Sequence, residues 1–181
     1  MILYGILGEK HNGKDTIADY IIEKHNFHKE SFAGPLKDLC RILFGFTEGQ
    51  LYGNDKQKVD EFWKVSPRDV FQFIGTDLFR KQFGKLCPHI NDKIWIEIVR
   101  RNIIKAKSDK IIISDVRFQN EVDLVHELGG IIIKVVRPSI QSKDTHDSEK
   151  LIRNIKDYDY LVVNDGTVEE LYNKVDKLLA T

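Results

Sequence analysis

The residues best suited to chemistry lie near the start of the chain, where Gly8 is followed after four residues by Gly13 and Lys14. This Gly-x4-Gly-Lys spacing is that of a phosphate-binding loop. In such a loop, successive backbone N–H groups form a concave anion site, and the helix that follows adds its unpaired N–H groups and its dipole. Gly13 lets the backbone approach the phosphates, and Lys14 brings a mobile positive charge to the β- and γ-phosphates. The spacing therefore predicts a site for a nucleotide phosphate donor.

The residues after the lysine narrow this prediction. Many phosphate-binding loops carry Ser or Thr there as a Mg²⁺ ligand, whereas here Asp15 holds that position and the hydroxyl follows at Thr16. The order Gly-Lys-x-Thr resembles the loop of nucleoside monophosphate kinases, which favours a small-molecule phosphotransferase. We expect the donor to be bound by Gly8, Lys10, His11, Asn12, Gly13, Lys14, Asp15 and Thr16.

A second polar motif, Asp115 to Glu121, follows the β-branched run Lys110–Ser114. Because ligands bind at the carboxyl ends of strands in parallel α/β sheets, Asp115 is expected to meet Mg²⁺, often through water, or a substrate hydroxyl. The planar fork of Arg117 suits phosphate oxygens. A structural Asp115–Arg117 ion pair, and a helix-capping role for Asn120 and Glu121, are the alternatives.

A third motif surrounds Gly75, inside a helix predicted to begin at Ser66-Pro67 and run toward Phe83. A glycine there costs up to about 1 kcal/mol relative to alanine, and it predicts close approach by another group such as a base or ribose. Arg80 is near enough to reach a phosphate at that surface. Arg68 lies about 18 Å from Arg80 along a straight helix, so both cannot touch one phosphate and Arg80 is favoured.

Other segments offer weaker candidates. The junction Ser31–Lys37 combines a strand end with Pro35 at a helix start, so its amides and Lys37 could hold an acceptor phosphate, with ordinary loop chemistry as the alternative. Arg137 ends a predicted strand and is placed to approach donor phosphates or stack on adenine. His146 and Glu149 could form a hydrogen-bonded latch, and their spacing does not suit zinc. Trp63 and Trp95 are more readily explained as core residues than as base-stacking platforms.

The elements that must position these residues alternate between apolar runs and helical patterns, as in a parallel sheet covered on both faces. Strands are expected at 2–7, 110–114, 130–136 and 158–163, with a weaker one at 28–32. Helices are expected at 15–24, from Ser66 toward Phe83, at 94–107, and from a capping box at Thr167 toward Leu179. Residues 45–64 and 138–150 are polar, and we expect them to be irregular candidate lids or plain solvated loops.

Composition sets outer limits on the function. The 181 residues carry 28 basic and 28 acidic side chains, and this balance argues against bulk binding of nucleic acid. We expect no membrane span, because no apolar run approaches about 20 residues. Because the chain opens directly on a strand, we expect no signal peptide; because its two cysteines have no metal-ligand spacing, we expect reduced thiols and a cytoplasmic protein.

Taken in order, these blocks resemble the deoxynucleoside monophosphate kinases of bacteriophages and large DNA viruses, in the P-loop kinase superfamily. The most specific blocks are Gly13-Lys14-Asp15-Thr16 and Asp115-Val116-Arg117-Phe118-x-Asn120-Glu121; the stretch Asn164–Thr167 is also similar to dephospho-coenzyme A kinase. The resemblance covers nearly the whole chain. It implies a three-layer α/β/α fold with a mainly parallel five-stranded sheet, of the nucleoside monophosphate kinase type.

The resemblance also implies an activity: transfer of the γ-phosphoryl group of ATP to a deoxynucleoside 5′-monophosphate, with Mg²⁺, for DNA precursor synthesis. Lys14, Arg117, Arg80 and Arg137 would be catalytic, Arg137 would also contact the donor, and Thr16, Asp15 and Asp115 would serve Mg²⁺ directly or through water. The substrate would be held by Ser31, Phe32, Ala33, Lys37, Arg68, Gly75, Arg80, Trp95, Asp115, Arg117, Asn120, Glu121, His146, Ser148 and Glu149.

Organisation and alternatives complete the prediction. We expect one P-loop kinase domain over residues 1–181, with an acceptor-binding insertion at about 33–108 and a lid-like segment at about 138–150. A phosphomevalonate or dephospho-coenzyme A kinase, and a nucleotide-binding module without transferase activity, are the competing functions. The accepted bases, a viral or cellular origin and the oligomeric state stay open; viral members of the family tend to form homodimers. A viral enzyme would act in the host cytoplasm.

Overall fold

The computed structural model describes residues 1–139 and 152–180. The chain divides into two compact units, one formed by Met1–Ser31 with Asn102–Thr181 and the other by Phe32–Arg101. We call the first the sheet unit and the second the helical unit. The second unit is close in extent to the segment predicted as the acceptor-binding insertion, whose role stays a prediction.

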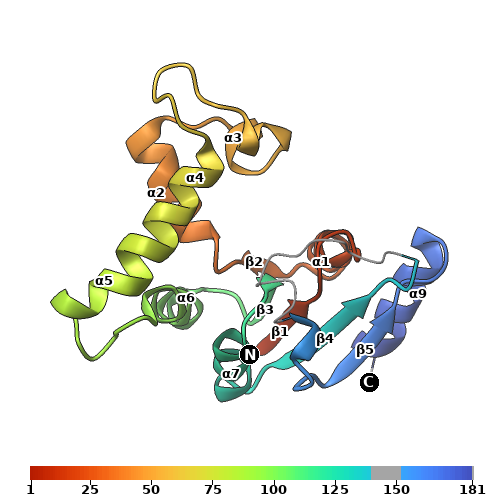
Figure 1. Ribbon diagram of the computed structural model, residues 1–181. Coiled ribbons are helices and arrows are strands. Elements are labelled where there is room, and N and C mark those ends of the chain that lie inside the picture. The colour runs from red at the N-terminus through yellow and green to blue at the C-terminus, as the bar shows by residue number, and fades with distance from the viewer. Residues whose placement is uncertain (140–151, 181) are drawn as a thin grey trace. The chain divides into compact units, whose positions relative to one another are not determined.

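The sheet unit is built on five parallel strands (Figure 1). They are β1 (Ile2–Leu7), β2 (His28–Glu30), β3 (Lys110–Val116), β4 (Ile131–Val136) and β5 (Tyr160–Val163). Their order is β2-β3-β1-β4-β5, so β1 is the central strand and pairs with both β3 and β4. The predicted parallel five-stranded sheet is confirmed.

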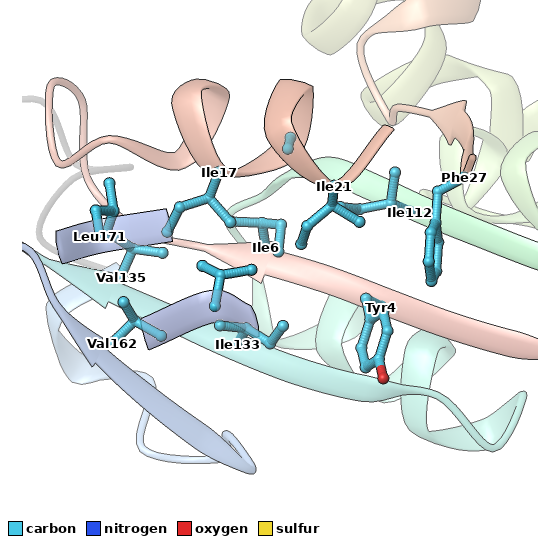
Figure 2. Close-up of a cluster of buried hydrophobic side chains, with 12 residues drawn as sticks. Tyr4, Ile6, Ile17, Ile21, Phe27, Ile112, Ile133, Val135, Val162 and Leu171 are labelled. Carbon is cyan, nitrogen blue, oxygen red and sulfur yellow. The ribbon is translucent and has the colours of Figure 1, made fainter. Parts of the chain in front are cut away.

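Helices cover both faces of this sheet. On one face, α1 (Lys14–His25) and α9 (Val168–Leu179) pack on a buried cluster that contains Tyr4, Ile6, Ile17, Ile21 and Leu171. Figure 2 shows side chains of α1 and of the strands meeting in this cluster. Complete burial of an isoleucine side chain stabilises the fold by about 1.5–3 kcal/mol. On the other face lies α7 (Gln119–Glu127), which contacts β1 and β4, so the unit has the predicted three layers.

The helical unit contains short helices and its own small core. Its elements are α2 (Gly34–Phe44), α3 (Glu48–Leu51), η1 (Asn54–Gln57), α4 (Pro67–Gln72), the π-helical turn η2 (Phe73–Leu78), α5 (Phe79–Leu86) and α6 (Ile94–Lys105), which continues into the sheet unit. A cluster of Cys40, Phe46, Leu51, Val70 and Ile74 forms the core. The helix predicted from Ser66 toward Phe83 is present, with the π-helical turn at its middle.

Two expectations about this unit need correction. Residues 45–64 are not irregular throughout, because Thr47 and Gln50 form a capping box that starts α3. The pattern Thr-x-x-Gln was in the sequence and is a recognised helix start. Trp63 is not a core residue: it is 39% exposed, packs its ring edge on Phe44 and donates its indole N–H to the Phe44 carbonyl at 2.8 Å.

Candidate functional site

The carboxyl ends of the parallel strands gather many of the predicted site residues at one edge of the sheet unit. The phosphate-binding loop follows β1, Asp115 and Arg117 lie at the end of β3, and Arg137 follows β4. Leu7 pairs with Val116 on one side and with Lys134 on the other, so the start of the loop is flanked by both neighbouring strands. Ser31 follows the edge strand β2. This edge is where parallel α/β sheets bind their ligands.

Two glycines of the loop are required by its shape. Gly13 has a φ of 98°, in the left-handed region, and a Cβ there would lie 2.6 Å from Nδ2 of Asn164. A Cβ on Gly8 would lie 2.7 Å from the backbone oxygen of Val135. Any side chain at either position would therefore force the loop away from strands β4 and β5.

Two asparagine amides fasten the loop to those strands. Asn12 donates from Nδ2 to the Val135 carbonyl at 3.2 Å, and Asn164 donates from Nδ2 to the Asn12 carbonyl at 3.0 Å. The backbone N–H of Asn164 in turn donates to the Val136 carbonyl at 2.8 Å. Both asparagine side chains are buried, so breaking either bond would leave an unsatisfied polar group out of water. These hydrogen bonds hold the loop in its conformation without any contribution from a ligand.

Asn164 holds the loop in place, and the sequence interpretation did not include it among the candidate site residues. It belongs to the block Asn164-Asp165-Gly166-Thr167, which entered the sequence analysis through the family resemblance and the start of the last helix, without a role in the site. Beside it, Asp165 accepts a hydrogen bond from Lys174 at 2.6 Å, and this bond lowers the pKa of Asp165 below its usual value. A polar residue that directly ends an apolar strand was the available signal, the same one that selected Asp115.

Lys14 begins α1 and is buried. Its Nζ donates to the backbone carbonyl of Glu9 at 3.4 Å, so its ammonium is turned back toward the loop. Gly13 is the N-terminal cap of α1 and makes no side-chain hydrogen bond, so the backbone N–H groups at the helix start can donate hydrogen bonds to an anion. Asp15 is exposed and Thr16 is half-buried in the same first turn.

A β-bulge shapes the end of β3. Gly5 pairs with Ile113 and Leu7 pairs with Val116, so β3 has one residue more than β1 over the interval that contains Ser114 and Asp115. Bulges re-aim side chains and recur beside active sites. Nothing in the alternation of the sequence indicated it, because Ser114 and Asp115 fit a regular strand end equally well.

Glu121 holds the turn that follows this strand. Its Oε2 accepts the backbone N–H of Arg117 at 2.7 Å and that of Phe118 at 3.2 Å. The carboxylate is buried, and the alternative that it caps the next helix is confirmed by these two bonds. Asn120, one residue earlier, has a buried Oδ1 without a hydrogen-bond partner among the described residues. Direct contact of either side chain with a substrate stays a prediction.

The donor atoms near the loop suit Mg²⁺ in a particular way. No group of three His, Cys, Asp or Glu side chains that could hold a metal is found within residues 1–139 and 152–180. Mg²⁺ is usually held by one or two protein oxygens together with waters and substrate phosphates, and the Thr16 hydroxyl and Asp115 carboxylate are donors of that kind. The residues present fit a cation brought in with a nucleotide.

In the helical unit, the residues around Gly75 are occupied by packing. A Cβ on Gly75 would lie 2.8 Å from Cδ2 of Leu36, so the close approach expected at this glycine is made by Leu36 of α2. Trp95 is 5% exposed and donates its indole N–H to the Gly75 carbonyl at 2.9 Å. The structure confirms Trp95 as a core residue, and contact of Gly75 or Trp95 with a base stays a prediction.

The other candidates in this unit differ in exposure. Phe32 is buried, Ala33 caps α2, and Lys37 of α2 lies with its Nζ 4.0 Å from the ring centroid of Tyr52. The two arginines lie on the helix that α4, η2 and α5 form together, with Arg68 exposed in α4 and Arg80 half-buried in α5. Their roles, and that of exposed Arg137 in the sheet unit, stay predictions. His146, Ser148 and Glu149, with most of the lid-like segment, lie outside the described residues.

Comparison with solved structures supports the fold. Dephospho-CoA kinase from Campylobacter jejuni superposes with a TM-score of 0.55 at 17% identity, over 99% of this chain and 96% of that chain. At this identity the likeness speaks for the fold alone. The parallel sheet with the order β2-β3-β1-β4-β5 and the Gly-Lys loop after its central strand show the fold of the P-loop kinases.

Comparison with known sequences gives the family. A profile described as deoxynucleotide monophosphate kinase matches residues 53–175. A protein of Acanthamoeba polyphaga mimivirus named "Putative deoxynucleotide monophosphate kinase" is 42% identical over 182 residues, covering 97% of this chain and 94% of that protein. The deoxynucleotide monophosphate kinase of Enterobacteria phage T4 is 24% identical over 248 residues, covering 99% of both. The chain belongs to the deoxynucleotide monophosphate kinase family.

The family assignment agrees with the resemblance expected from the loop and from the motif after β3. In the described part of the chain, no helix combines the length and apolar character needed to cross a bilayer.

Proposed function

We propose that this protein transfers the γ-phosphoryl group of ATP to deoxynucleoside 5′-monophosphates, giving diphosphates for DNA synthesis. The family match supports the acceptor class. The observation that supports ATP as the phosphate donor is the loop Gly8–Thr16. Its conformation is fixed by buried hydrogen bonds to Val135 of β4 and to Asn164, directly after β5. An anion site that is already in shape costs little reorganisation when the phosphates arrive.

In phosphoryl transfer, the main tasks of the protein are to position the donor and acceptor phosphates and to neutralise their negative charge. The backbone N–H groups of the loop and of the first turn of α1 would hold the donor phosphates, with the Lys14 ammonium beside them. Thr16, with Asp15 or Asp115, would hold Mg²⁺. When bound, the cation neutralises developing negative charge on the transferring group.

The acceptor side depends on cationic side chains. A phosphate monoester has its second pKa near 6, so the attacking oxygen is already largely ionised at neutral pH and no general base is needed. Arg117, at the fixed turn after β3, is our principal candidate to neutralise the acceptor and the transferring group, since a guanidinium makes two parallel bonds to phosphate oxygens. Arg80 and Arg137 are the secondary candidates.

A substrate panel tests the activity. The protein, with ATP and Mg²⁺, is offered each deoxynucleoside monophosphate, phosphomevalonate and dephospho-coenzyme A, and ADP formation is followed in a coupled assay. We expect turnover with at least one deoxynucleoside monophosphate and none with the other acceptors. Turnover confined to one of those acceptors, or ATP binding without any transfer, would overturn the proposal.

Two variants test the principal acceptor residue. Arg117→Ala should lower kcat/KM about 10²- to 10³-fold, the usual cost of removing one charge-stabilising donor. Arg117→Lys should recover only part of that loss, because an ammonium cannot make the bidentate contact. If Arg117→Lys recovered the wild-type kcat/KM in full, Arg117 would act only through its positive charge and not through a bidentate contact.

A further inference from the structure

One carboxylate in the phosphate-binding loop has an unexpected place. Glu9 lies between Gly8 and Lys10, in a loop that would bind the polyanionic tail of a nucleotide. A negative side chain there opposes phosphate binding unless its charge is neutralised, because like charges at short range repel. Glu9 was absent from the residues that the sequence predicted for the site.

The structure supplies the neutralising partner from the far end of the chain. Arg153 donates from Nε to Oε1 of Glu9 and from Nη2 to Oε2 of Glu9, each at 3.0 Å. This is the parallel two-bond geometry that a guanidinium makes with a carboxylate. The side chain of Glu9 is 17% exposed and that of Arg153 is 45% exposed, so the pair is partly shielded from solvent.

Arg153 is itself in a fastened segment. Two residues after it, the carbonyl of Ile155 accepts a hydrogen bond from Lys134 of β4 at 2.5 Å, and Ile155 is buried. Burial lowers the pKa of Lys134, while the negative charge of Glu9 acts in the opposite direction. Glu9 therefore lies within the electrostatic reach of two cations, and one of them belongs to the strand beside the loop.

The backbone of Glu9 is also engaged. Its carbonyl accepts the Lys14 ammonium at 3.4 Å and the backbone N–H of Asn12 at 3.3 Å. The same residue thus has its side chain held by Arg153 and its carbonyl turned toward Lys14.

We propose that Arg153 is a positioning residue for the donor site, acting through Glu9. Its guanidinium neutralises the charge of Glu9 beside the incoming phosphates. The inference rests on the proposed function only in taking the nucleotide to be ATP. Direct contact of Arg153 with the donor is the competing explanation.

A double-mutant cycle separates the two. The binding of MgATP to the full chain is measured by calorimetry, without acceptor, for the wild type, Glu9→Gln, Arg153→Gln and the double variant. Arg153→Gln removes the ion-pair partner of Glu9 and leaves more of its negative charge facing the phosphates, so we expect affinity to fall about tenfold. Glu9→Gln removes the repulsion and should change affinity less than threefold. The double variant should return to the level of Glu9→Gln, because the charge that Arg153 cancels is gone.

The outcomes are exclusive. If the double variant binds ATP as weakly as Arg153→Gln, the arginine acts on the donor itself and the proposal fails. If Arg153→Gln binds as tightly as wild type, the pair is only a surface contact and the proposal also fails. Rescue in the double variant supports it, and a general loss of stability would not produce rescue.

Two further measurements keep the test decisive. The loss in Arg153→Gln should shrink as ionic strength rises, because screening weakens the repulsion between Glu9 and phosphate. Should Arg153→Gln fail to fold by circular dichroism, Arg153→Lys keeps the charge without the two-bond geometry and should show a smaller loss. Arg101→Gln, an exposed arginine outside the loop, is the matched control and should bind as wild type.

The binding test of Arg153 and the transfer assay of the proposed function can fail independently of each other. Normal ATP binding and rescue, combined with no transfer to any deoxynucleoside monophosphate, would end the proposed activity and leave the role of Arg153 standing. Transfer without rescue would do the reverse.

Discussion

The two units bury polar groups for different purposes. In the sheet unit, the buried amides of Asn12 and Asn164 and the buried Lys14 all serve the conformation of one loop. In the helical unit, the buried indole N–H of Trp95 serves the packing of Gly75 in a helix. The first arrangement fixes the conformation of the loop after β1, whereas the second completes a core.

This difference sorts the predicted site residues. The contacts of Asn12, Gly13 and Lys14 all shape the loop after β1, and the role of this loop in binding the donor stays a proposal. In the helical unit, Gly75 and Trp95 make internal contacts, and the cationic candidates are Lys37, Arg68 and Arg80. Any acceptor phosphate bound there should therefore depend on those cations.

Removal of the loop lysine should have the largest effect. We expect Lys14→Ala to lower kcat about 10³-fold or more, because the ammonium meets the charge that develops on the transferring phosphate. The coupled assay with ATP and a productive acceptor measures this. The matched control Lys177→Ala, at an exposed position of α9, should keep wild-type turnover. Near-normal turnover of Lys14→Ala would remove the lysine from the mechanism.

The asparagine that fastens the loop should come next. In Asn164→Asp, a carboxylate oxygen would replace the donor that faces the Asn12 carbonyl, and the unsatisfied buried group costs about 1–3 kcal/mol. We expect the KM for ATP to rise about 5- to 100-fold while the KM for the acceptor changes little. Equal rises in both constants would show that Asn164 supports the whole fold and not the loop in particular.

A tryptophan replacement tests the other side of the comparison. Trp95→Phe removes the indole N–H and leaves the Gly75 carbonyl without its donor, which should lower the free energy of unfolding by about 1–3 kcal/mol in urea titrations, with the acceptor KM unchanged. The control Trp63→Phe loses a bond to the Phe44 carbonyl near solvent and should cost less. A raised acceptor KM at unchanged stability would assign Trp95 to the substrate.

The smallest effect should be seen in acid. Asp176 of α9 accepts hydrogen bonds from Lys24 and Tyr20 of α1, which lower its pKa from 3.8 to about 2. A carboxyl group whose pKa is lower in the folded state than in the unfolded chain stabilises the fold when the pH is above its unfolded-state pKa. This contribution is lost as the pH falls from about 4 to about 2. The difference in Tm between wild type and Asp176→Asn should therefore narrow over that range. A constant difference would assign the effect of Asp176 to packing.

Much of the fold could be predicted because local patterns and topology agree. The run Lys110–Ser114 and the other apolar segments predict parallel strands. The Gly8-x4-Gly13-Lys14 spacing predicts the loop and its position at the carboxyl edge of the sheet. A capping box at Thr167 gives the start of the last helix, as observed.

The contacts between distant segments could not be predicted in the same way. The pairing of Glu9 with Arg153 and of Asn12 with Asn164 depends on which strands are neighbours, and short-range spacing does not encode that. The bulge at Ser114-Asp115 depends on register with β1. Gly75 shows the opposite error: the glycine correctly signalled a close approach, and the sequence could not say that Leu36 makes it.

The central position of β1 has a consequence for how the molecule is made. Strand β1 is synthesised before its neighbours β3 and β4, and the loop that follows it is synthesised long before Asn164, which is 152 residues from Asn12. Pairings this remote in the chain are slow to close. A nascent or truncated polypeptide that ends before Asn164 would therefore contain the whole Gly8-x4-Gly13-Lys14 motif but lack the hydrogen bond from Asn164 that fixes the conformation of the loop.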